Sequence, residues 1–345
     1  MSEDSKNTEI MQDLSKPSTP MEYLRLFFTG FAMGASDIVP GVSGGTMAFI
    51  LGVYETLLNA IKSFNFTAIK MALGLFSSAS EDEEKPTIMG IVDYLHLRFL
   101  IALGLGLLIA VALLSSLLEN WLETQPTYLF AFFAGLILAS VVAIGLKVKW
   151  TLISGISLIV GVVIAFLITN PELGTLSDTM GHGSLALLIS GMIAICAMIL
   201  PGISGSFILL ILGQYDFILG AVHDRDIVSL IYVAAGAGIG ILAFSRILSW
   251  LLKRYESPTI ALLVGFMLGS MRLIVFRMTH LDTSAGEGLP AYTLLEVSAA
   301  QWGIGFGFAI FGFLLVTLLD HMQTRNNPFF RIFMGNKAAT PVTES

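Results

Sequence analysis

Two stretches of this chain are copies of one another, and they restrict how the rest of it can fold. The first copy runs from Val39 to Glu55 and the second from Leu200 to Asp216. Pro, Gly, Ser, Gly, Leu, Gly, Tyr and an acidic residue recur between them at one constant offset of 161 residues, without a gap. The chain is therefore an internal duplication, and each copy interrupts a hydrophobic segment.

Each copy predicts a helix, a short unwound tip and a second helix. Pro40 and Pro201 lack a backbone N–H, so each ends the helix before it. Glycines permit the turn, and Ser43 and Ser204 stand where the N-cap of the next helix belongs. Unwound backbone at membrane depth is tolerated only inside protein or beside a wet cavity. Two such breaks at matching places in two halves indicate a transporter's substrate site.

Composition places the chain in a membrane. It is 55% hydrophobic and only 12% charged, and its mean hydropathy is +0.83. The net charge of −7 argues against a nucleic-acid partner. A single cysteine, Cys196, supports neither a disulfide framework nor a cysteine metal site. We therefore expect an integral membrane protein with no metal and no cofactor.

The predicted fold is an all-α integral membrane protein built as an inverted repeat. Each half holds one re-entrant helical hairpin, whose arms are too short to span, and three transmembrane helices. A polar stretch over 62–98, with an acidic run at 81–84, is predicted to be a solvated loop. The predicted elements are a tail (1–21), a first repeat over 22–169 (hairpin 22–61, helices 99–118, 127–146 and 150–169), a second repeat over 184–320 (hairpin 184–222, helices 227–252, 258–277 and 297–319) and a second tail (321–345).

Positive charge predicts the topology. Three full spans in each half are an odd number, so the second half enters from the opposite side of the membrane. The linkers 119–127 and 170–183 hold no Lys or Arg, whereas both tails and the 62–98 stretch hold several. By the positive-inside rule, both termini and 62–98 lie in the cytoplasm and 170–183 lies outside.

The two tips are predicted to bind an anion. A helix that begins at such a tip directs free N–H groups and about half a positive charge at whatever lies ahead of it. Two such ends facing each other can hold a phosphate or carboxylate. The alternative is that the glycines only allow packing while the hydroxyls cap their own helices. The predicted substrate-binding residues of the tips are Ser43, Gly44, Gly45, Thr46, Ser204, Gly205 and Ser206.

Charged residues near the hydrocarbon are costly, and they usually serve function. Asp37 precedes the first tip, and its counterpart in the second copy is the apolar Met198. Asp37 is a candidate for proton coupling, or it is satisfied by nearby backbone N–H groups. Glu55 and Asp216 match in both copies and are further proton-coupling candidates, although a surface role suits them equally. Arg272 can reach an anion or extend to the outer surface.

A serine hydrolase is the third functional class that the tips admit. Gly41-Val42-Ser43-Gly44 fits the pattern G-x-S-G, but a serine nucleophile needs a base within hydrogen-bond reach. The five histidines fall in linkers or at the ends of spans, and the duplication places a serine in both halves. We therefore predict no enzymatic activity and no catalytic residue.

The run from Gly34 to Thr46, followed by Gly52-Val53-Tyr54-Glu55, resembles the signature of a bacterial and archaeal membrane family linked to polyprenyl-phosphate transport. That family was formerly a domain family of unknown function, and the resemblance covers about residues 22–320. It implies a translocase of the bacterial cytoplasmic membrane that returns undecaprenyl phosphate, the lipid carrier of envelope polymers, from the outer to the inner leaflet. From the residues alone, a secondary transporter of a small soluble anion remains the alternative, and the oligomeric state stays open.

Overall fold

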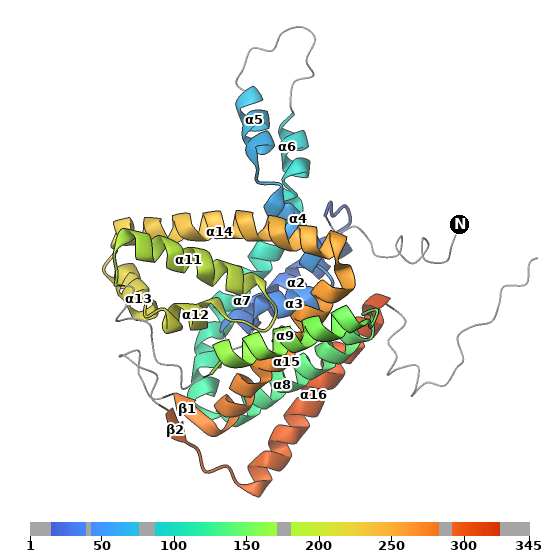
Figure 1. The fold of residues 1–345 in the computed structure, drawn as a ribbon, viewed down its shortest axis with the longest axis vertical. Helices are drawn as coiled ribbons and strands as arrows, with labels where there is room; N and C mark the ends of the chain where they lie inside the picture. The colour runs from blue at the N-terminus through green and yellow to red at the C-terminus, as the bar shows by residue number, and fades with distance from the viewer. Residues whose placement is uncertain (1–14, 39–42, 76–86, 171–180, 283–291, 325–345) are drawn as a thin grey trace, which may run out of the picture. The chain divides into compact units, whose positions relative to one another are not determined.

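The computed structural model describes residues 15–38, 43–75, 87–170, 181–282 and 292–324, which are almost entirely helical (Figure 1). The first half of the sequence forms α2 (Pro20–Ile38), α3 (Gly44–Ile50), α4 (Tyr54–Lys62), α5 (Phe66–Gly74), α6 (Ile88–Tyr94), α7 (Leu97–Thr124), α8 (Pro126–Gly145) and α9 (Leu152–Ile168). The second half forms α11 (Ser184–Ile199), α12 (Gly205–Ile211), α13 (Tyr215–His223), α14 (Ile227–Arg254), α15 (Glu256–Thr279), β1 (His280–Asp282), β2 (Tyr292–Leu294) and α16 (Ala299–Thr324). The predicted all-helical class is confirmed apart from the short antiparallel ladder of β1 and β2.

Within these residues, five helices are long and apolar enough to cross a membrane: α7, α8, α14, α15 and α16 as far as Leu318. The number rises to seven if the bent pairs α3–α4 and α12–α13 each form one span. The predicted span 150–169 is shorter than expected, because α9 has 17 residues and Thr151 caps its start by accepting from the Ser154 N–H. At 1.5 Å per residue α9 is about 26 Å long, a little less than a hydrocarbon core.

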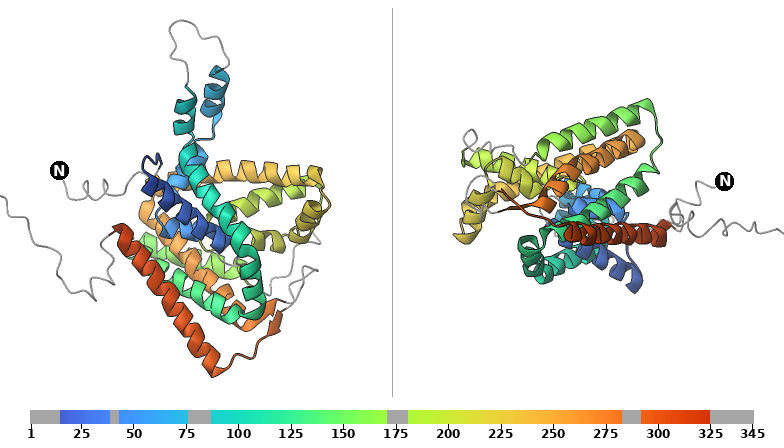
Figure 2. Two further views of the ribbon diagram at one scale, coloured as in Figure 1. Left: turned by 180° about the vertical axis from the view of Figure 1, so that it is seen from behind. Right: turned by 90° about the horizontal axis from the view of Figure 1, so that it is seen from below.

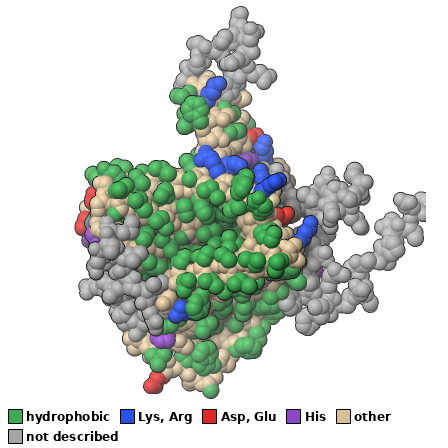
Figure 3. Space-filling view, viewed as in Figure 1, with side chains coloured by type: hydrophobic (Ala, Val, Ile, Leu, Met, Phe, Trp, Pro, Cys, Tyr) green, Lys and Arg blue, Asp and Glu red, His purple; other side chains and the backbone are tan. Residues whose placement is uncertain are grey.

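The chain forms two compact units, and each draws elements from both halves of the sequence. The first unit contains α2 to α6, α7 as far as Leu118, and α11 to α14. The second unit contains α8, α9, α15, α16, the β ladder and residues 201–203. Apolar side chains cover most of the face drawn in Figure 3, as expected for helices that meet lipid.

Glycines bring the helices of the first unit together. A Cβ at Gly30 of α2 would overlap the carbonyl of Leu103 in α7, and one at Gly236 of α14 would overlap the carbonyl of Leu188 in α11. In Figure 2, α2 runs beside α7 and α11 beside α14. Because α2 corresponds to α11 and α7 to α14 in the duplication, both halves use the same close packing of backbones.

Glycines also bring the helices of the second unit together, but here each pair combines one helix from each half of the sequence. Gly265 of α15 packs on Leu158 of α9, and Gly135 of α8 packs on Ala309 of α16. Gly135 and Gly265 share a local pattern in the sequence, since each follows a small or β-branched residue and precedes a buried serine by five positions. The second helix of each half therefore packs on the third helix of the other half (Figure 2).

Each predicted hairpin contains a second bend that the sequence analysis did not predict. Helices α3 and α4 meet at 115°, and α12 and α13 meet at 107°. At the bends, Gly52 has φ 71° and Gly213 has φ 66°, conformations that suit glycine. The Val53 N–H donates to the Ala48 carbonyl and the Gln214 N–H donates to the Leu209 carbonyl, the six-to-one bond of a Schellman cap. Each hairpin therefore has three helices instead of two.

The stretch 62–98 is also more structured than predicted. It contains α5 and α6, which lie side by side and are joined at their base where Asn65 and Tyr94 bond through their side chains at 2.9 and 3.1 Å. The loop prediction is wrong for these two helices, because Asn65 supplies an N-cap by accepting from the Ala68 N–H. The acidic run at 81–84 lies outside the described residues.

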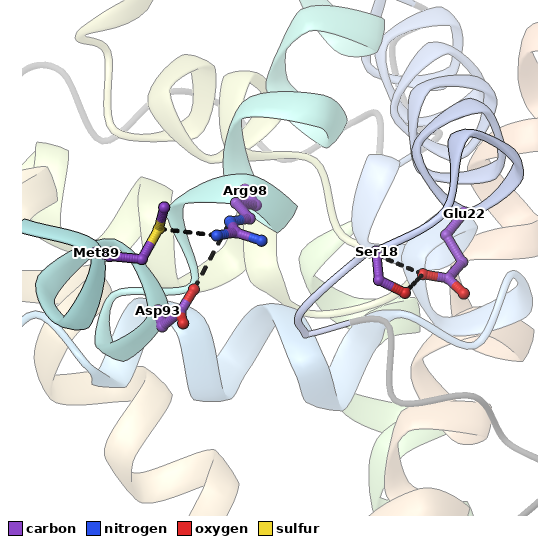
Figure 4. Close-up of polar contacts among 5 residues, drawn as sticks. All are labelled: Ser18, Glu22, Met89, Asp93 and Arg98. Carbon is purple, nitrogen blue, oxygen red and sulfur yellow. Dashed lines mark hydrogen bonds and ion pairs between the residues drawn. The ribbon is translucent and has the colours of Figure 1, made fainter.

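Polar contacts mark the starts of α2 and α7 (Figure 4). Glu22 accepts from the backbone N–H groups of Ser18 and Thr19, and these bonds lower the pKa of its carboxyl below the ordinary value. The Glu22 N–H in turn bonds to the Thr19 hydroxyl, which completes a capping box ahead of Pro20. At α7, Arg98 lies 3.7 Å from the Asp93 carboxylate and donates to the Met89 sulfur.

Candidate functional site

The first tip places Asp37 and Ser43 on the N-terminus of α3. The Gly44 N–H donates to Asp37 Oδ1 at 2.6 Å, and the Gly45 N–H donates to Ser43 Oγ at 3.1 Å. Ser43 is the predicted N-cap, with extended backbone angles of −121° and 132°. The first two N–H groups of α3 thus have acceptors from their own chain, and one of those acceptors carries a negative charge. Asp37 was expected either to couple protons or to be satisfied by nearby backbone N–H groups. The bond from the Gly44 N–H is of the second kind.

The second tip has the same helix start but different capping. The backbone of Ser204 is extended and α12 begins at Gly205, as predicted, yet no side chain caps this helix in the part of the chain that the structure describes. Ser204 Oγ instead lies 2.8 Å from Ser206 Oγ. Met198 replaces the carboxylate of the first copy. The two tips are therefore alike in the extended serine and the helix that follows it, and unlike in charge.

The first tip touches the end of the helix that leads into the second tip. Ser43 directs its hydroxyl at the carbonyls of Met198 (3.3 Å) and Leu200 (3.5 Å), and the Tyr54 hydroxyl donates to the Ile199 carbonyl at 3.0 Å. The last carbonyls of a helix have no partner within it. The side chains of one copy thus satisfy the carbonyls that Pro201 and the break leave at the end of α11.

Glycine is required for this contact between the copies. A Cβ at Gly45 would lie 2.7 Å from the Ile199 oxygen and 3.0 Å from the Met198 oxygen. One at Gly44 would lie 2.5 Å from Asp37 Oδ2. Both predicted glycines are thus positions where the backbone must come close to a polar atom, which is a physical reason for the Gly-Gly pair.

In the second unit, the tip residue Gly202 packs on the middle of α15. Its φ is 86°, and an added Cβ would lie 2.9 Å from the backbone nitrogen and Cα of Met267. The backbone here is both left-handed and in contact with another backbone. Gly202 therefore fixes residues 201–203 against α15.

The remaining predicted residues lie in three kinds of place. Thr46 is fully buried in α3. Glu55 and Asp216 are exposed in the first turns of α4 and α13, where a negative charge suits the helix dipole. Arg272 is half-buried on α15, with its guanidinium 4.4 Å from the centre of the Phe166 ring and Nη1 3.5 Å from the Phe166 carbonyl. That placement matches an arginine extended along the neighbouring helix α9.

The described contacts of Ser43 bear on the hydrolase alternative. Its hydroxyl contacts the Gly45 N–H and the carbonyls of Met198 and Leu200, which are backbone groups and cannot act as a general base. Among the described residues, no three His, Cys, Asp or Glu side chains gather as metal ligands. The geometry around Ser43 is that of a helix cap that also contacts a second helix.

Comparison with known proteins identifies the relatives of this chain. Residues 33–288 match the model of a family described as undecaprenyl phosphate translocase-like. A polyprenyl-phosphate transporter of Vibrio cholerae is 43% identical over 254 residues, which is 73% of this chain and 77% of that protein. A polyprenyl-phosphate transporter of Staphylococcus aureus is 31% identical over 317 residues, 86% of this chain and 96% of that protein. No solved structure matches.

Proposed function

Since this chain belongs to the undecaprenyl phosphate translocase-like family, we propose that it returns undecaprenyl phosphate from the outer to the inner leaflet of the bacterial cytoplasmic membrane. It is a multi-pass membrane protein whose relatives are named polyprenyl-phosphate transporters. The observation that carries the proposal is the hydrogen-bonded contact of the two tips, from Ser43 and Tyr54 to the end of α11. It gathers polar backbone from both copies in a segment that is otherwise apolar.

In this proposal the phosphate headgroup binds at the tips while the prenyl tail stays in lipid. A lone phosphate cannot enter a hydrocarbon core of about 30 Å, because burying an unpaired charge is prohibitively costly. We expect donors from Ser43, Gly44, Gly45 and Thr46 at one tip, where the phosphate must displace present acceptors such as the Asp37 carboxylate. Ser204, Gly205 and Ser206 are the expected donors at the other tip. The two repeats are inverted, so each tip enters from its own side of the membrane.

Asp37 gives the proposal a means of proton coupling. Its carboxylate accepts a hydrogen bond from the Gly44 N–H at 2.6 Å, and a phosphate oxygen at this tip would need the same donor. A proton taken up on the Asp37 carboxylate weakens it as an acceptor and frees the N–H for substrate, and loss of the proton restores the original bond. Glu55 and Asp216 are the further proton-coupling candidates, at the exposed starts of α4 and α13.

Replacement of Ser43 by alanine separates a transporter from a hydrolase. The change removes a helix cap and the contacts to Met198 and Leu200. We expect it to lower the free energy of unfolding by about 1 kcal/mol while most of the transport activity remains. A hydrolase that lost its nucleophile would lose almost all activity. The assay is surface accumulation of lipid phosphate in cells that lack other carriers. The control is Ser43→Gly, which also removes the hydroxyl but keeps a tolerated N-cap residue, so it should be destabilised less than Ser43→Ala and should transport at least as well.

Intact protein that never lowers surface lipid phosphate in these cells would overturn the proposed function. Complete loss of activity in the Ser43→Ala variant, at a normal expression level, would instead favour the serine hydrolase.

The topology is tested by labelling single cysteines in a Cys196→Ser background. Thr67 lies in α5, within the 62–98 stretch that the charge pattern assigns to the cytoplasm. Asp224 lies between α13 and α14, where the predicted second hairpin returns to the outside, and both residues are exposed. An impermeant thiol reagent applied to intact cells should label Asp224→Cys and spare Thr67→Cys. Both should react once the membrane is permeabilised. Equal labelling in intact cells would contradict the inverted repeat.

A further inference from the structure

The bend of the second hairpin is bonded to the segment that leads into α11, and the proposed function does not yet use this contact. Gln214, at the bend between α12 and α13, is fully buried. Its Nε2 donates to the Gly181 carbonyl at 2.7 Å, and its Oε1 lies 3.1 Å from His182 Nδ1. Because Oε1 can only accept, His182 Nδ1 is the donor of this second bond. Both ends of one buried amide are thus bonded to residues 181 and 182.

An aromatic contact completes this attachment. The His182 ring stacks on the Phe217 ring of α13, with the ring centroids 4.5 Å apart and the planes 3° from parallel. His182 is exposed, whereas Gln214 has no exposed surface. The start of α11 and α13 lie at the same end of the first unit (Figure 1). We call the contacts of Gln214 and Phe217 with Gly181 and His182 the clasp.

The first copy builds a similar bend without a clasp. Val53 stands at the position of Gln214 and is also fully buried, but its side chain cannot form hydrogen bonds. Met21 stands at the position of His182 and is 72% exposed. At both bends the backbone N–H, of Val53 or Gln214, donates to the carbonyl five residues earlier. A valine is therefore enough to form the bend, and the amide of Gln214 serves the attachment to residues 181 and 182.

The clasp and the second tip lie at opposite ends of α12. This helix begins at Gly205, next to Ser204, and its seven residues span about 10 Å at 1.5 Å per residue. A movement of the tip is therefore passed along one short helix to Gln214. In the predicted topology the start of α11 lies outside, so the clasp is on the side from which the lipid phosphate starts its return.

The strength of the clasp suits a contact that opens and closes. Hydrogen bonds that water can replace contribute little net free energy, and the exposed His182 is open to water. A buried amide without any partner is costly, so Gln214 favours either the closed clasp or a position where water reaches it. These two arrangements are separate states of the hairpin, and the lipid phosphate can shift the balance between them.

We propose that the clasp holds the second hairpin closed on the outside and must open for the lipid phosphate to reach the second tip. This assignment rests on the proposed function and adds a gating step to it. Gln214 and His182 act here through the position of α12, and neither of them binds the phosphate.

The test locks the clasp in cells that lack other carriers. In a Cys196→Ser background, His182→Cys and Phe217→Cys replace the two stacked rings, and a short, impermeant bis-methanethiosulfonate reagent joins the two thiols. Before the reagent is added, this variant should lower surface lipid phosphate at least as fast as its parent. The cross-linked protein should lose transport, and a reductant that cleaves both disulfides to the reagent should restore it.

The matched control pair is Leu219→Cys with His223→Cys in the same background. Both residues are exposed in α13 and lie one turn apart, so their cross-link stays within one helix. This pair should keep its transport with the reagent. Normal transport by cross-linked His182→Cys/Phe217→Cys would overturn the gate, and so would equal loss in both pairs. A Cys196→Ser parent that never lowers surface lipid phosphate would contradict the proposed function itself.

Gln214→Val separates a gate from a purely structural contact. The variant removes both bonds of the amide and places at this bend the residue type that the first copy uses. Release of a gate should raise the initial rate of transport severalfold, whereas loss of a structural contact would lower the melting temperature and the transport rate together. A transport rate no higher than that of wild type, at equal expression, would contradict the gating role of Gln214.

Discussion

Replacing Gly202 by alanine is expected to destabilise the protein by about 2–5 kcal/mol and to abolish transport. The left-handed φ of 86° costs an L-residue about 1–2 kcal/mol. The new Cβ would also lie 2.9 Å from the backbone of Met267, where neither chain can move cheaply, and such overpacking costs about 1–3 kcal/mol more. Thermal unfolding of the purified protein and surface lipid phosphate in cells measure the two effects.

The matched control is Gly220→Ala in α13. Gly220 belongs to the same repeat and lies inside a helix, and an added Cβ there would meet nothing within 4 Å. Alanine favours a helix over glycine by about 1 kcal/mol, so this variant should be unchanged or slightly more stable. Equal melting temperatures for Gly202→Ala and Gly220→Ala would contradict the role of Gly202 in holding the tip on α15.

Replacing Arg272 by glutamine is expected to abolish the return of undecaprenyl phosphate. Helix ends contribute about 0.3–2 kcal/mol each, which is too little to desolvate a phosphate, so a charged partner is needed. The present contacts of Arg272 can be given up, since a cation–π pair contributes about 0.5–1 kcal/mol at an exposed site and its bond to the Phe166 carbonyl is long at 3.5 Å.

The control for this charge is Arg272→Lys, which should retain part of the transport because it keeps the positive charge. Surface lipid phosphate is the readout for both variants, with expression checked on blots. Normal transport by Arg272→Gln would show that the arginine only extends along α9 and does not bind the phosphate.

The helix starts were predictable because they depend on strong local preferences. The sequence predicts N-caps at Ser43 and Ser204, and the structure begins α3 at Gly44 and α12 at Gly205. The break before α12 follows from Pro201, which lacks a backbone donor, whereas Pro40 lies outside the described residues. Six long apolar runs were likewise found as α7, α8, α9, α14, α15 and α16, since length and hydropathy are enough to locate such helices.

The second bends were visible in the sequence as a pattern but were not interpreted. Leu-Gly-x-Tyr recurs in both copies, and a glycine after a helical run is the usual sign of a C-cap. Gly52 and Gly213 occupy that position, and their Schellman bonds turn the chain by more than 100°. A search for helix ends as well as helix starts would have predicted three helices in each hairpin.

Two features of the structure could not be read from sequence. The bond from Tyr54 to the Ile199 carbonyl joins residues 145 positions apart, and nothing local indicates it. The burial of Arg277 was not predicted, because α15 is apolar on nearly all sides and its pattern does not tell which face is buried. The structure separates Arg277 from Arg272 by burial, whereas the sequence presents them as two similar arginines near one helix end.

The central claim is that this chain moves a polyprenyl phosphate between leaflets, and reconstitution tests it most directly. Purified protein in liposomes should speed the exchange of a fluorescent polyprenyl phosphate between leaflets, well above protein-free liposomes and above liposomes with Gly202→Ala. The same liposomes should not take up radiolabelled inorganic phosphate. Uptake of free phosphate with no acceleration of the lipid would contradict the account and make the chain a transporter of a soluble anion.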